Sequence, residues 1–187
     1  MDSKTLQNKV GRLTTWLVLL LGLAGPTVEV RAVMSREYET KAAYLLKFIS
    51  YIDWADQSLP PMGGTIVIGV VGENPFAPEL VAEINAEKIK GRALVLKEVS
   101  SPAELRNCQI VFISLSEKQR CGQILESLKD AKTLTVSEID GFAKQGGIIN
   151  FFSEHNKVRF EINPDVARSK GLTISSELLK LANVVKS

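Results

Sequence analysis

The most regular alternation of hydrophobic and polar residues lies near the C-terminus, in the segment KVRFEI at residues 157–162. Its apolar side chains would point to one face of a strand and its charged side chains to the other. The preceding segment, residues 148–153, is apolar on both faces, as expected for an inner strand. Between them, Glu154, His155 and Asn156 form a tight polar break, and asparagine tolerates the left-handed backbone of such a turn. The pattern predicts an antiparallel hairpin whose second strand lies near the edge of a sheet.

Earlier in the chain, short continuous apolar runs alternate with helical patterns. The runs are rich in β-branched residues, which favours strands buried on both faces. Strands that alternate with helices are typical of a largely parallel sheet covered on both sides. We therefore predict an α/β fold, a Rossmann-like three-layer sandwich with a mostly parallel sheet and the C-terminal antiparallel hairpin at its edge. The predicted strands are residues 65–71, 93–99, 109–113 and 133–136, and the predicted helices are residues 76–87, 102–105 and 117–129.

Residues 37–54 have the period of a helix, with one aliphatic stripe and a stripe of aromatic residues beside it. Together the two stripes exceed one buried face. The helix is therefore either enclosed in the core or shared across a homodimer interface, and both interpretations stay open. In the second case, the residues expected at the interface are Tyr44, Phe48 and Tyr51.

Capping residues mark the elements that follow the hairpin. Asn163, followed by proline, is typical of a helix start, and Gly171 of a helix end. Residues 172–174 are predicted to be extended, and either Ser175 or Ser176 to cap a last helix. That helix has a broad apolar face, which must pack against the rest of the domain.

The first 32 residues have the features of a secretory signal peptide. A basic start precedes an apolar run of roughly a dozen residues, too short for the ~20 that span a bilayer. Val30-Arg31-Ala32 offers small residues where a signal peptidase cleaves. We predict cleavage near Ala32, a single domain at residues 33–187 and, in a bacterium, a periplasmic location. The alternatives are an uncleaved anchor, or cleavage after Ala24 or Gly25.

Composition agrees with a folded domain and excludes one class of partner. Of the 187 residues, 45% are hydrophobic and 24% are charged, as in globular proteins. The formal net charge is +2, but the segment through Ala32 holds Lys4, Lys9, Arg12 and Arg31 against Asp2 and Glu29. The remainder is close to neutral, which gives no electrostatic case for binding nucleic acid or an anionic membrane surface.

No arrangement of residues predicts catalysis, a metal site or a cofactor site. The turn after residues 65–71 lacks the glycine spacing of a dinucleotide site, because only Gly69 and Gly72 are present and valine stands where the pyrophosphate would approach. His155, the single histidine, lies at the predicted hairpin turn with only Glu154 as a neighbouring ligand. We therefore predict a protein that is not an enzyme and that binds no cofactor or metal.

Cys108 and Cys121 are candidates for a disulfide in an oxidising compartment. Cys108 would begin a strand and Cys121 would lie early in the following helix. The rise along the two elements places the α-carbons well beyond the ~7 Å limit for a bridge. We predict no intrachain disulfide. An intermolecular bond through Cys121 stays open if that side chain is exposed.

The C-terminal region carries a family resemblance. The strings GGIINFF and KVRFEINPDVARSKGLTISSELLKLA, which begin at Gly146 and Lys157, resemble the signature of the YfiR family. The resemblance extends back through residues 37–54, 66–76, 91–92 and 107–116, and so covers nearly all of the chain after the N-terminal segment. The motifs are short, but their order and spacing together are specific. Family members with a disulfide at the position of Cys108 use partner cysteines that this sequence lacks.

The resemblance implies a function. YfiR-family proteins are periplasmic, and the best-known member represses an inner-membrane diguanylate cyclase. This chain would hold the periplasmic domain of a diguanylate cyclase, or of a sensor kinase of similar build, inactive and so modulate cyclic-di-GMP signalling. An outer-membrane lipoprotein would sequester it and lift the repression. The alternative is a periplasmic small-ligand sensor that uses the cleft at the strand ends near residues 72–76.

The charged face of residues 157–162 has two interpretations. It is either a solvated face that discourages edge pairing, or part of a docking surface that continues to Ser176. The residue pattern slightly favours the first interpretation, and the resemblance raises the weight of the second. The residues predicted to contact the partner are Arg159, Glu161, Asn163, Ser175 and Ser176.

Overall fold

The structure is a computed structural model that describes residues 27–54 and 59–186. Its contacts divide the chain into two units, residues 1–36 and 37–187, and the fold below is that of the second. The predicted signal peptide lies outside the described residues, except for the backbone from Thr27 onward, and stays a prediction. Among the described residues, no helix combines the length and the hydropathy needed to cross a bilayer.

The second unit is built on a mixed sheet. Its strands are β2 (Thr65–Val71), β3 (Lys88–Ile89), β4 (Arg92–Glu98), β5 (Ile110–Ile113), β6 (Leu134–Ser137), β7 (Ile149–Glu154), β8 (Lys157–Ile162) and β10 (Asn183–Val184). They lie in the order β10-β8-β7-β6-β5-β2-β4-β3. The five strands from β4 to β7 are parallel, and the hairpins β7–β8 and β3–β4 are antiparallel. The predicted α/β class, with a mostly parallel sheet and a C-terminal antiparallel hairpin, is confirmed.

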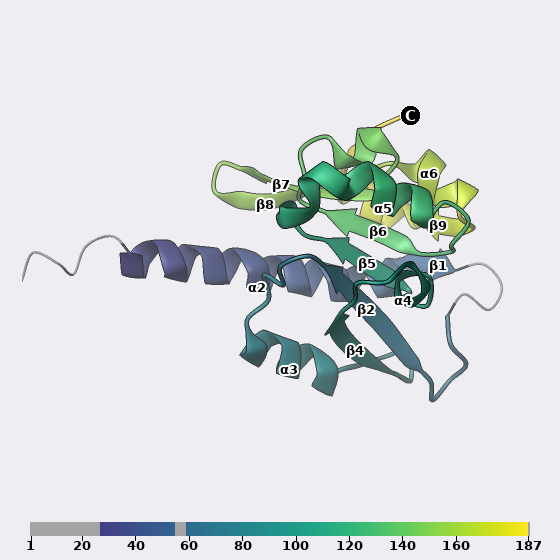
Figure 1. Ribbon diagram of the computed structural model, residues 1–187, viewed down its shortest axis with the longest axis horizontal. Helices are drawn as coiled ribbons and strands as arrows, with labels where there is room; N and C mark the ends of the chain where they lie inside the picture. Colours follow the sequence, from purple (N-terminus) through teal and green to yellow (C-terminus); the bar gives the residue numbers. More distant parts are fainter. Residues whose placement is uncertain (1–26, 55–58, 187) are drawn as a thin grey trace, which may run out of the picture. The chain divides into compact units, whose positions relative to one another are not determined.

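Helices pack on both faces of this sheet (Figure 1). In β5, Ile110 and Phe112 belong to one apolar cluster, whereas Val111 and Ile113 belong to the other. The first cluster includes residues of α2 (Thr27–Tyr51), α3 (Pro78–Ala86), α6 (Pro164–Ser169) and α7 (Ser176–Leu181). The second includes residues of α4 (Pro102–Arg106), α5 (Cys121–Ser127) and the 3-10 turn η3 (Phe142–Gln145). Successive residues of a strand point to opposite faces, so the apolar residues of β5 contribute to both clusters.

Buried hydroxyl groups join β6 to the neighbouring strands. The Thr135 hydroxyl accepts a hydrogen bond from the backbone N–H of Ile148, with a distance of 3.1 Å between the two atoms. The Ser137 hydroxyl donates to the backbone oxygen of Ile113 at 2.7 Å. Both side chains are fully buried, and each polar group is satisfied by backbone, as buried polar groups require.

The helix predicted over residues 37–54 is wrong at its C-terminal end. It ends at Tyr51, and β1 (Ile52–Trp54) follows, paired antiparallel with β9 (Leu172–Ile174). The backbone oxygen of Tyr51 accepts from Ser175 N–H at 3.0 Å, so pairing with β9 replaces the last helical turn. The pairing with a distant strand determines the conformation of residues 52–54, and the local periodicity of the sequence cannot predict such a pairing.

Two further boundaries differ from the prediction. The helix predicted over residues 117–129 begins as the 3-10 turn η2 (Leu115–Arg120), continues as α5 and ends at Ser127. The edge position predicted for β8 holds only in part, because β10 pairs with its last two residues, Glu161 and Ile162.

Both cysteines are buried in the second cluster, with 2% of each residue exposed, and both are free. The exposure that an intermolecular bond through Cys121 would need is therefore absent. Burial raises the pKa of each thiol above its ordinary value, which keeps the reactive thiolate scarce at neutral pH.

We expect both thiols to react slowly with a disulfide reagent in the folded protein and rapidly after unfolding in guanidinium without reductant. Absorbance of the released chromophore measures both rates. If unfolding without reductant frees fewer than two thiols per chain, the two cysteines form a bridge, and the prediction from the sequence fails.

Candidate functional site

The docking surface, as we use the term, consists of Arg159 and Glu161 on β8 together with Asn150 and Phe152 on β7. Glu161 lies opposite Asn150 and Arg159 opposite Phe152, and opposite residues of an antiparallel pair share a face of the sheet. The intervening Phe160 and Ile162 point to the other face and belong to the first core cluster. The predicted alternation of β8 is therefore confirmed, and Arg159 and Glu161 lie on one face as expected.

The charges of this surface are only partly compensated. Arg159 is exposed, and its Nε lies 3.8 Å from a carboxylate oxygen of Glu154, a weak surface ion pair. Glu161 is half-buried and has no ion pair with any other residue that the structure describes. A half-buried carboxylate without a cation is an acceptor for a positively charged group of another molecule.

Asn150 leaves a second acceptor unused beside Glu161. Its Nδ2 donates to a carboxylate oxygen of Glu161 at the long distance of 3.5 Å. Only 4% of the residue is exposed, and its buried Oδ1 has no hydrogen-bond partner in the described part of the chain. A buried orphan acceptor costs about 1–3 kcal/mol, so this part of the surface is not optimised for the isolated chain.

The other residues predicted to contact a partner lie in different environments. Asn163 is fully buried, where its Oδ1 accepts from Val166 N–H at 3.1 Å and its Nδ2 donates to the backbone oxygen of Ala143 at 2.9 Å. It is a helix cap that also joins α6 to η3, which corrects its expected place on the surface. Ser175 caps α7 by accepting from Leu178 N–H at 3.2 Å, and Ser176 is exposed.

The three aromatic residues predicted at a dimer interface differ in their burial. Phe48 is fully buried, with its ring 5.8 Å from that of Phe151 and 5.4 Å from that of Phe160, so it has no surface to offer a second copy. Tyr44 is half-buried against Phe48 and Phe160. Tyr51 is 40% exposed. Only Tyr44 and Tyr51 keep surface for an interface.

A buried charge network lies where α2 meets the carboxyl end of β6, and no motif in the sequence predicts it. Lys41, with 3% of its side chain exposed, contacts Glu138 and lies 2.6 Å from a carboxylate oxygen of Glu37. The Tyr38 hydroxyl donates to Glu138 at 3.0 Å. Burial, followed by the charge of Glu138, raises the pKa of Tyr38 above its usual range. The available signal was the position of Lys41 between Tyr38 and Leu45 on the apolar face of the helix.

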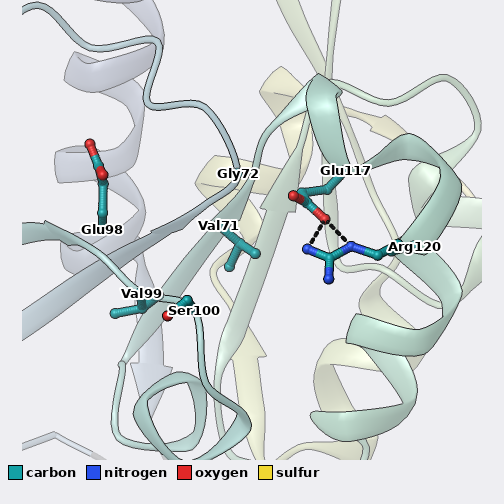
Figure 2. A pocket seen from close by; sticks show the side chains of 7 residues that line it. All are labelled: Val71, Gly72, Glu98, Val99, Ser100, Glu117 and Arg120. Atoms are coloured by element: carbon teal, nitrogen blue, oxygen red, sulfur yellow. Dashed lines mark hydrogen bonds and ion pairs between the residues drawn. The ribbon is translucent and has the colours of Figure 1, made fainter.

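A pocket of about 320 Å³ opens at the carboxyl ends of β2 and β4 (Figure 2). Glu117 and Arg120 form one wall, where both Nε and Nη2 of Arg120 contact the same Glu117 oxygen, at 2.8 and 2.7 Å. Gly72 has a φ of +87°, and a Cβ there would collide with the side chains of Ser116 and Glu117, so glycine is required on both grounds. The lining residues are Val71, Gly72, Glu98, Val99, Ser100, Glu117 and Arg120. The pocket overlaps the predicted cleft at Gly72 but does not extend to Phe76, which is buried.

Comparison with known proteins identifies a family. A sequence profile described as YfiR/HmsC-like matches residues 38–183. The curated proteins contain no significant match.

A comparison with solved structures gives two matches. A conserved domain protein from Vibrio cholerae O1 biovar eltor superimposes with a TM-score of 0.53 at 14% identity, over 80% of this chain and 60% of that one. The ABC domain from Streptococcus pneumoniae in complex with L-Trp gives a TM-score of 0.47 at 15% identity, over 69% and 57%. The chain thus spans 60% or less of the length of either structure. At this identity, the first likeness concerns the fold alone.

Proposed function

The chain belongs to the YfiR/HmsC-like family, and we propose that it represses a membrane diguanylate cyclase by binding the periplasmic domain of that enzyme. The observation that carries the proposal is the family match over residues 38–183, which spans the whole sheet apart from the last residue of β10. The family suggests a periplasmic, non-catalytic regulator of cyclic-di-GMP signalling. The predicted signal peptide supports the same location.

The docking surface supports binding to another protein. Glu161 has a carboxylate without a cation, and Asn150 beside it has a carbonyl oxygen without a donor. A partner that supplies a lysine or arginine side chain would pair with the Glu161 carboxylate, whereas the Asn150 oxygen is buried out of its reach. The exposed Arg159 provides a polar position at the rim of the interface.

The proposed mechanism is a shift of the partner between two states. If the protein binds the inactive state of the cyclase more tightly than the active state, binding shifts the equilibrium toward the inactive state, at saturation by the ratio of the two affinities. An outer-membrane lipoprotein that binds the repressor would lower its free concentration and release the cyclase. A homodimer that uses Tyr44 and Tyr51 would be compatible with this mechanism.

Deletion of the protein is expected to raise cellular cyclic-di-GMP, and a chain carrying Glu161→Gln is expected to restore repression only in part. The substitution removes the charge of the half-buried Glu161 and should weaken binding roughly tenfold, or by about 1.4 kcal/mol. Mass spectrometry of nucleotide extracts measures cyclic-di-GMP, and immunoblotting of periplasmic fractions confirms equal amounts of each variant.

Glu177→Gln, an exposed position on α7, is the matched control and should restore full repression. If deletion leaves cyclic-di-GMP unchanged, the proposed function is wrong. If deletion raises it but Glu161→Gln represses as well as the original chain, the function stands and the docking surface is misplaced.

A further inference from the structure

The sheet has two edges, and they are closed to different extents. At one edge, β3 pairs with the start of β4, and the backbone N–H of Leu96 further along β4 donates to the side-chain oxygen of Asn85 at 2.7 Å. At the other edge, β10 pairs only with Glu161 and Ile162, so residues 157–160 of β8 have no strand beside them in the described chain. They belong to the hairpin that projects beyond the neighbouring strands (Figure 1). An open edge is a template for pairing with another chain.

The backbone of this open edge faces outward at Val158. The Asn163 N–H donates to the backbone oxygen of Ile148 across the hairpin, with 2.8 Å between the two atoms. Hydrogen-bonded and non-bonded positions alternate along an antiparallel pair, so every second residue counted back from Asn163 bonds to β7. The residues between them direct their N–H and C=O groups away from β7, and the bond from the Val185 N–H to the outward oxygen of Ile162 agrees with this. Val158 therefore presents an N–H and a C=O to an incoming strand.

Two positive charges flank Val158 on the strand. Lys157 and Arg159 are both exposed. Lys157 forms no ion pair with any residue that the structure describes, and Arg159 has only the 3.8 Å contact with Glu154. Residues directly opposite one another in a sheet share a face, so an added strand would fit best with acidic residues beside these two side chains. Beside Val158, which packs partly against the first core cluster, it would fit best with an apolar residue.

A second copy of this chain does not fit the open edge. In a two-fold pairing centred on Val158, Lys157 of one copy would lie opposite Arg159 of the other, and a pairing centred on Lys157 would oppose two lysines. A pairing centred on Arg159 needs the outer edge of Glu161, which β10 already occupies. Like charges opposite one another destabilise a pair of strands. The charges that exclude a second copy therefore favour an acidic partner.

We propose that residues 157–160 bind an extended segment of another protein by strand addition, and that this segment alternates acidic and apolar residues. Main-chain hydrogen bonds to Val158 would give affinity, and acidic side chains beside Lys157 and Arg159 would give specificity. The edge adjoins the docking surface but uses backbone groups of β8 that point away from β7. The inference goes beyond the proposed repression and does not depend on it.

The rate at which backbone amides exchange with solvent, measured by NMR on the ¹⁵N-labelled protein, tests the proposal. In the free protein, the Val158 N–H should exchange faster than that of Arg159, which bonds to β7. The probe is the acetylated and amidated hexapeptide Ser-Glu-Val-Glu-Val-Ser. At a concentration about ten times its Kd, the peptide should slow exchange at Val158 roughly tenfold, because the amide is accessible only in the unbound fraction.

Three controls separate the backbone from the charges. The same peptide with every backbone nitrogen methylated keeps its side chains but has no N–H donors, and it should give no protection. The lysine analogue Ser-Lys-Val-Lys-Val-Ser should bind roughly tenfold more weakly. Lys157→Gln should weaken the affinity for the acidic peptide roughly threefold, whereas Lys118→Gln, an exposed position on η2, should leave it unchanged.

The proposal is wrong if the acidic peptide leaves exchange at Val158 unchanged, or if the methylated peptide protects this amide equally. It is also wrong if the lysine analogue binds as tightly as the acidic peptide, or if Lys157→Gln has no effect on the affinity. Protection of Val158 that rises with the concentration of the protein alone would show that a second copy occupies the edge, which also overturns the proposal. None of these measurements involves the cyclase, so their outcome is independent of the proposed function.

Discussion

Replacing Lys41 by methionine is expected to lower the free energy of unfolding by about 3–5 kcal/mol. Methionine keeps most of the aliphatic length of the side chain but removes the ammonium group. Glu138, only 10% exposed, would then keep its charge with a tyrosine hydroxyl but without a cation. An uncompensated buried charge is among the most destabilising changes in a core. Urea denaturation followed by circular dichroism measures the effect.

Two further variants separate the charge from the packing. The Glu37 side chain is 33% exposed and is the more exposed carboxylate partner of Lys41. Glu37→Gln should therefore lower the free energy of unfolding by less than about 1 kcal/mol. The double substitution Lys41→Met with Glu138→Leu removes both buried charges and should recover much of the stability lost in the single variant. If the double variant is as unstable as Lys41→Met, the loss arises from packing and the charge argument is wrong.

Phe48→Ala is expected to cost about 3–5 kcal/mol, because truncation would open a cavity between α2 and the hairpin β7–β8. The Phe48 ring is fully buried and contacts the rings of Tyr44, Phe151 and Phe160. Aromatic contacts of this kind add to the burial of apolar area, so the loss should lie near the upper end of the range for core residues. Thermal and urea denaturation both report it.

The comparison with Tyr51→Ser distinguishes the core from an interface. Tyr51 is 40% exposed, and its replacement should change the stability of an isolated chain by no more than about 0.5 kcal/mol. If α2 contributes to a homodimer through Tyr51, this variant should instead shift the elution volume in size-exclusion chromatography towards the monomer. Phe48→Leu should leave the elution volume unchanged. A reversal of these two results would place Phe48, and not Tyr51, at an interface.

Local sequence patterns predicted most of the sheet because β-branched runs and capping residues act over a few residues. β2 occupies the predicted positions Thr65–Val71, and Asn163 caps α6 as expected. Two of the elements that were missed, β1 and β10, depend on distant partners. β1 pairs with β9, and β10 pairs with the last two residues of β8, so neither pair could be found from the periodicity of one segment.

The candidate sites were harder to predict than the fold. Strand alternation placed Arg159 and Glu161 correctly on one face, since a period of two is a local property. The orphan oxygen of Asn150 arises only when β7 and β8 are paired, and the charge network of Lys41 only when α2 reaches Glu138. Asn163 was correctly predicted to cap a helix, but its side chain is buried by the cap and by its hydrogen bond to Ala143, so it does not lie on the surface.

The buried hydroxyl of Thr135 has a consequence for how β7 aligns with its neighbours. Ile148 and Ile149 are both fully buried, so hydrophobicity alone would tolerate a slip of one residue at this point of the sheet. Such a slip would break the hydrogen bond from the Ile148 N–H to the Thr135 hydroxyl and leave that N–H without an acceptor in an apolar interior. Thr135 thus fixes the register of β7, which the two consecutive isoleucines alone would leave ambiguous. A redesign that made β6 entirely aliphatic would make that register ambiguous again.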